Sequence, residues 1–120
     1  MTLDEYNVFC GRLAHTSHVV QWGNAHVWKV AAKVFAIGGW QKQGEELFVT
    51  FKVSPMSFDL LQQEPGCRPA PYLASRGMKW IQRTDASSMD DDGLKDYLRE
   101  SYRLVSLGLS KKKQKELGFN

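Results

Sequence analysis

The sequence has little that could cross-link the chain or carry it through a membrane. It contains two cysteines, Cys10 and Cys67, in 120 residues, a length that normally builds a hydrophobic core without disulfides or metals. We therefore expect free thiols in a reducing cytoplasm. No apolar run approaches the ~20 residues that a membrane span needs, and the acidic Asp4 and Glu5 stand where a secretion signal carries basic residues. The sequence predicts one cytoplasmic domain over residues 1–120, with no membrane partner.

Recognisable catalytic and metal-binding motifs are also lacking. His15 and His18 have a His-x-x-His spacing, but they lie in a polar stretch expected to form an exposed loop, with no second cysteine nearby. No phosphate-binding loop or dinucleotide fingerprint is present, and no spacing gathers a nucleophile, a base and an acid. We therefore expect no metal, no cofactor and no enzymatic activity. An activated, exposed thiol at Cys67, between Gly66 and Arg68, stays open as an alternative.

The periodicity of apolar residues predicts a mixture of helices and strands. Thr2 and Glu5 have the spacing of a capping box ahead of an apolar stripe that ends near Leu13. Further helices are expected at residues 56–62, from a cap at Ser88 or Asp90 to Gly108, and over about two turns at 111–117. Strands are expected at residues 19–22, 27–31, 33–37, 47–53 and 78–83. The prolines in residues 64–71 favour an irregular connector.

These elements define a fold class. Alternation in residues 47–53 puts Leu47, Val49, Phe51 and Val53 on one purely apolar face, which should face the core. Connections between the early strands are too short for parallel crossovers, so the sheet should be antiparallel. Two amphipathic helices should cover one side of it. The prediction is an α+β fold, a two-layer sandwich whose N- and C-terminal helices lie on one face of an antiparallel sheet.

Four blocks of sequence resemble a known family. They are residues 21–23 (Gln-Trp-Gly), 28–36, 69–74 leading to Trp80, and 101–105 followed by 110–117. In this order and spacing they resemble the bacterial MmcQ/YjbR family, which is similar in fold to the bacterial frataxin CyaY. The family is described as DNA-binding, with a "double wing" arrangement of hairpins. Matching family positions, Trp22 and Trp80 are interpreted as core residues.

The chain departs from the family pattern at two places. Ser110 stands where relatives carry a proline, and Ala31-Ala32 stands where they carry glycine in a tight turn. Because a positive φ is costly without glycine, we expect this hairpin tip to adopt a different turn.

The resemblance implies weak, salt-sensitive binding of double-stranded DNA by a monomer. The net charge of +3 and the pI of about 8.9 are compatible with DNA binding but do not by themselves indicate it. The expected contacts are basic side chains of the strands and their connections, which would neutralise phosphates, with three lysines near the end as auxiliaries. These residues are Lys29, Lys33, Lys52, Arg76, Lys79, Lys111, Lys112 and Lys113.

The alternative is a protein- or small-ligand-binding module with no role on DNA. Its surface would be the Pro69–Arg76 region, where rigid prolines could hold Tyr72 and Arg76 in place, together with Trp40, the tryptophan with the best chance of exposure. A continuous positive face across the hairpins would favour DNA. A concave pocket around Tyr72 with few lysines would favour a ligand.

Overall fold

The computed structural model describes residues 1–119 and has the predicted α+β architecture. Its helices are α1 (Leu3–Gly11), α2 (Pro55–Leu61), α3 (Asp91–Leu107) and α4 (Lys111–Glu116), with a short 3₁₀ helix η1 (Ala74–Arg76). The strands are β1 (Thr16–Gln21), β2 (Ala25–Val30), β3 (Lys33–Gly38), β4 (Val49–Lys52), β5 (Cys67–Pro69) and β6 (Trp80–Arg83). The helices within residues 1–119 all fall short of the length and apolar character needed to cross a bilayer.

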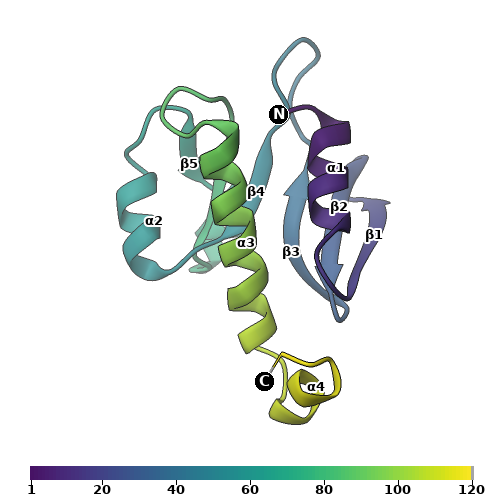
Figure 1. Ribbon diagram of the computed structural model, residues 1–120. Coiled ribbons are helices and arrows are strands. Elements are labelled where there is room, and N and C mark those ends of the chain that lie inside the picture. Colours follow the sequence, from purple (N-terminus) through teal and green to yellow (C-terminus); the bar gives the residue numbers. More distant parts are fainter. Residues whose placement is uncertain (120) are drawn as a thin grey trace.

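The strands form one antiparallel sheet in the order β1-β2-β3-β4-β6-β5. Helices α1 and α3 lie side by side on one face of it, as Figure 1 shows. We call this the helix-covered face and the opposite one the open face. The predicted two-layer sandwich is therefore confirmed.

The main core lies between the sheet and these two helices. Tyr6 and Cys10 of α1 and Leu94 and Leu98 of α3 are fully buried there. The apolar side of residues 47–53 joins them, as its alternation predicts. Thr2 and Asp90 accept the hydrogen bonds of the predicted helix caps, from the amides of Glu5 and Gly93.

Ser101 joins α3 to the sheet where the β3–β4 ladder stops. The last paired residues are Ala36 and Phe51, so the next pair in register would be Phe35 and Lys52. Instead of bonding directly, these two are bridged by Ser101. Its Oγ donates to the Phe35 carbonyl at 2.6 Å and accepts from the Lys52 amide at 2.9 Å. One hydroxyl thus satisfies two backbone groups.

Two local expectations are wrong. The β2–β3 tip does not switch to another turn: Ala31 and Ala32 both have positive φ, 47° and 69°, as a two-residue type I′ hairpin requires. The segment with prolines is not wholly irregular, because Cys67–Pro69 forms β5. As the last strand in the order, β5 tolerates a proline that an interior strand would not.

Candidate functional site

The antiparallel register gathers lysines at one end of the sheet. Lys33 directly follows the β2–β3 turn, and Lys29 precedes it on β2. Because β3 and β4 run in opposite directions, Lys52 at the end of β4 lies at the same end as Lys33. Lys79 joins them, since its carbonyl accepts from the Val53 amide at 3.0 Å. Four predicted residues from three strands and a connection thus share one end of the molecule.

Helix α4 adds its lysines to that end. Lys33 Nζ donates to the Gly108 carbonyl at 3.2 Å, just before α4. His15, next to the start of β1, contacts the Leu117 carbonyl through Nε2 at 2.8 Å, just after α4. Ser110, in place of the family's proline, caps α4 by accepting from the Lys113 amide. Figure 1 shows α4 and the β2–β3 turn opposite the N-terminus. The basic end, as we call it, comprises Lys29, Lys33, Lys52, Lys79, Lys111, Lys112 and Lys113.

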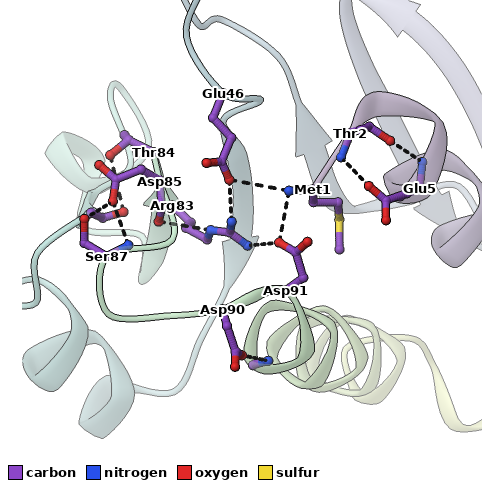
Figure 2. Close-up of polar contacts among 12 residues, drawn as sticks. Met1, Thr2, Glu5, Glu46, Arg83, Thr84, Asp85, Ser87, Asp90 and Asp91 are labelled. Atoms are coloured by element: carbon purple, nitrogen blue, oxygen red, sulfur yellow. Dashed lines mark hydrogen bonds and ion pairs between the residues drawn. The ribbon is translucent and has the colours of Figure 1, made fainter.

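Acidic residues gather at the opposite end, around the start of α3. Asp91 and Glu46 both contact the Met1 ammonium and the Arg83 guanidinium, at distances between 2.5 and 3.4 Å (Figure 2). The hydrogen bond from the ammonium, aided by Arg83, lowers the pKa of Asp91 below its ordinary value. Asp90 and Asp92 lie beside them and form no ion pair within residues 1–119, so carboxylates outnumber cations at this end.

The lysines of the basic end form few ion pairs among the described residues. Within residues 1–119, its single ion pair joins Lys113 to Glu116 at 3.9 Å. The lysines do not all point the same way: Lys79 Nζ lies 4.7 Å from the ring centroid of Phe58 on α2, whereas strand alternation directs Lys52 to the open face. They surround one end of the molecule rather than lining a single flat face.

Arg76, the remaining residue of the predicted DNA set, lines a pocket on the open face instead. The pocket has a volume of about 820 Å³, and Trp40 and Tyr72 line it as well. The three residues proposed for a ligand are therefore brought together. The floor of the pocket lies on a row of residues that pair from strand to strand across the whole sheet. In strand order these are Val19, Val27, Ile37, Thr50, Gln82 and Arg68.

Four residues that line the pocket were not predicted from the sequence. Trp22, interpreted as a core residue, is 54% exposed and lines the pocket from the β1–β2 connection, while Trp80 is buried as expected. The other three are Ile37, Arg68 and Gln82. The turn signal at Gly23-Asn24 after Trp22 could have indicated exposure. No local signal pairs Arg68 with Gln82, because β5 was not predicted.

Arg68 is held in position from two sides. Its Nε donates to Gln82 Oε1 at 2.8 Å, and its guanidinium lies 5.5 Å from the ring centroid of Phe48. Gln82 in turn donates through Nε2 to Thr50 Oγ1 at 3.4 Å in a buried contact. This arrangement fixes a planar cation at the wall of the pocket.

The histidines and cysteines form no comparable site. His18 is exposed as expected but lies in β1 rather than in a loop; its Nε2 is 3.0 Å from His26 Nδ1. No three metal-ligating side chains of the His, Cys, Asp or Glu type cluster in the described part of the chain. Cys67 is buried, and burial raises the pKa of its thiol, so the alternative of an exposed, activated thiol is wrong.

Comparisons with known proteins agree with the architecture. A family model described as YjbR matches residues 11–104. The crystal structure of Deinococcus radiodurans protein DR2400, which contains a domain described as DUF419, is similar, with a TM-score of 0.83 and 26% identity over 98% of this chain and 88% of that one. A protein from Pseudomonas syringae has the same fold, with a TM-score of 0.68 and 17% identity over 87% of this chain and 98% of that one. No curated protein matches the chain.

Proposed function

The chain belongs to the YjbR family, and we propose that it is a non-catalytic protein that binds double-stranded DNA weakly through its basic end. The observation that carries the proposal is the separation of charge. Seven lysines from five segments meet at one end, and Asp90 and Asp92, which form no ion pair within residues 1–119, lie at the other. A phosphate backbone attracts such an end and is repelled by the opposite one.

The β2–β3 hairpin would act as a wing in this proposal. Its tip carries Lys33, and Lys29 lies a few residues before it. Lys111 and Lys112, on the first turn of α4, are exposed and have no carboxylate partner within residues 1–119. Their role is to neutralise phosphates, which fixes position on a duplex without reading bases.

The expected affinity is modest and strongly dependent on salt. The scattered directions of the lysines limit simultaneous contacts to about three phosphates, so affinity should fall roughly 40-fold between about 50 and 200 mM salt. Sequence preference should be small, because lysines on phosphates carry no base information.

The test is a titration of labelled duplex DNA at several salt concentrations. The variant Lys111→Gln/Lys112→Gln should weaken binding and reduce the slope of log affinity against log salt by about two. The matched control Lys42→Gln/Lys95→Gln also removes two lysines but leaves the basic end intact, so its slope should equal that of the unmodified protein. Absence of salt-sensitive association at low salt would end the proposal, as would an equal loss in both double variants.

A further inference from the structure

Two arginines give the pocket on the open face a positive charge. Arg68 and Arg76 both line it, and its lining includes no acidic residue in the described part of the chain. Within residues 1–119, neither arginine has a carboxylate within ion-pair distance. Two uncompensated guanidinium groups at one concave site favour an anion, and a doubly charged one most of all.

The two terminal nitrogens of Arg68 are available to bind a ligand. Its Nε donates a hydrogen bond to Gln82, and Phe48 lies against the guanidinium plane. The two terminal nitrogens have no hydrogen-bond partner within residues 1–119. They form the planar fork that binds two oxygens of a phosphate or carboxylate. Because the group is held before any ligand arrives, little conformational freedom is lost on binding.

Three aromatic side chains line the same pocket, and all three stand on strained backbone. Trp22, Trp40 and Tyr72 have φ of 53°, 80° and 68°. Bulky residues rarely adopt such values, and each costs on the order of 1 kcal/mol or more relative to an ordinary conformation. Strain of this kind, repeated at one site, is typical of side chains held for binding.

Tyr72 shows the strain most clearly. The Leu73 amide donates to the Pro71 carbonyl at 2.8 Å, which closes a γ-turn around Tyr72. With a positive central φ, this is the rare and strained form of that turn. The side chain it projects is 79% exposed. Burial therefore does not explain why a tyrosine occupies a position that suits glycine.

Trp22 and Tyr72 are exposed, whereas Trp40 is half-buried and packs against Val27 and Ile37. Trp40 Nε1 donates to the Trp22 carbonyl at 2.7 Å, which fixes the orientation of the Trp40 indole. Within residues 1–119, neither these two rings nor that of Tyr72 packs against another aromatic ring. A planar group placed among them would gain stacking contacts of the kind that bind nucleobases.

We propose that this pocket binds a phosphate monoester that carries a flat aromatic ring, in the chemical class of nucleoside monophosphates. The dianionic phosphate lies between Arg68 and Arg76, and the ring lies against the aromatic walls. The volume of about 820 Å³ suits a ligand of this size. The site is separate from the basic end and does not depend on the DNA-binding proposal.

The test follows the indole N–H signals of a ¹⁵N-labelled protein by NMR during titration with AMP, GMP, CMP and UMP. The signals of Trp22 and Trp40 should shift, while those of Trp28 and Trp80, which do not line the pocket, should stay in place. Adenosine and inorganic phosphate each supply half of the ligand. Each should bind at least about 10-fold more weakly than AMP, since each loses either the arginine contacts or the stacking.

Two variants separate binding from folding. Arg76→Gln removes an exposed side chain and should weaken AMP binding at least about 10-fold. Arg12 is an exposed arginine outside the pocket, so Arg12→Gln should leave AMP binding unchanged. Tyr72→Gly removes a stacking surface and should weaken AMP binding about 5-fold or more. It should also raise the unfolding midpoint, because glycine relieves the strained turn. A purely structural tyrosine would not combine a gain in stability with a loss of binding.

The same chemistry could come from a free nucleotide or from the 5′-phosphorylated end of a strand. Titration of a 5′-phosphorylated oligonucleotide into the Lys111→Gln/Lys112→Gln protein distinguishes these sources. Tighter binding than AMP identifies a strand end, and equal or weaker binding identifies the free nucleotide.

The proposal is overturned if no nucleotide shifts the Trp40 signal at millimolar concentration, if AMP binds no better than adenosine or phosphate, or if Arg76→Gln binds AMP normally. Loss of DNA binding in the lysine variant, with AMP binding intact, would leave the pocket proposal standing.

Discussion

Replacing Ser101 by alanine should destabilise the protein through two backbone groups rather than through lost packing. The Ser101 side chain is fully buried, and its Oγ bonds the Phe35 carbonyl and the Lys52 amide at 2.6 and 2.9 Å. Alanine leaves both groups without this partner, the Phe35 carbonyl in a buried position and the Lys52 amide in a partly buried one. An orphaned buried polar group costs ~1–3 kcal/mol. The two together should lower the free energy of unfolding by about 2.5 kcal/mol, allowing for partial relaxation.

A matched control lies on the same helix. Ser106 is 6% exposed, and its Oγ donates to the carbonyl of Tyr102, four residues earlier in α3. That carbonyl lies within the helix and keeps a helical partner, so Ser106→Ala orphans no backbone group. Alanine also has the higher helix propensity. We expect a change within about 0.5 kcal/mol for this variant.

The assay is equilibrium unfolding in urea, with thermal unfolding as a second measurement. Ser101→Ala should reduce the midpoint without changing the slope. At about 4 °C per kcal/mol for a chain of this size, the melting temperature should fall by roughly 10 °C. If Ser101→Ala costs no more than Ser106→Ala, the bridge between β3 and β4 contributes nothing and the reasoning is wrong.

Three further predictions concern stability. Ala31→Gly/Ala32→Gly should raise the free energy of unfolding by about 1 kcal/mol in urea titrations, because glycine adopts positive φ without strain. Arg83→Met should cost about 2 kcal/mol, less than a fully buried ion pair, because its carboxylate partners are partly exposed. The lowered pKa of Asp91 means that its stabilising contribution is present above its unfolded pKa and is lost as pH falls through the folded pKa. Acid titration should therefore destabilise the unmodified protein more than Asp91→Asn, and equal curves would contradict this.

Local features of the fold could be predicted from the sequence because their partners lie a few residues apart. The Thr2–Glu5 capping box, the Asp90 cap and the alternation of residues 47–53 all formed as expected. In contrast, β5 depends on a distant partner: Cys67–Pro69 is a strand because β6 lies beside it. Its own prolines argue against a strand in isolation.

The basic residues were identifiable by type but not by place. Composition shows only a net charge of +3. Separation of this charge into two ends follows from the antiparallel register and from the contact of Lys33 with the Gly108 carbonyl, which holds α4 near the β2–β3 turn. The same structure assigns Arg76 to the pocket rather than to the lysines.

The sequence by itself determined the fold class, the helix caps and which residues could serve as phosphate or ligand contacts. Tertiary structure alone decided that Trp22 is exposed and that Arg68 lies against Gln82. The physical reason is that hydrophobicity predicts burial only on average. A residue with positive φ in a connection between strands can direct an apolar ring toward solvent. A pocket made of residues 22 to 82 exists only once strand register has brought them to one face.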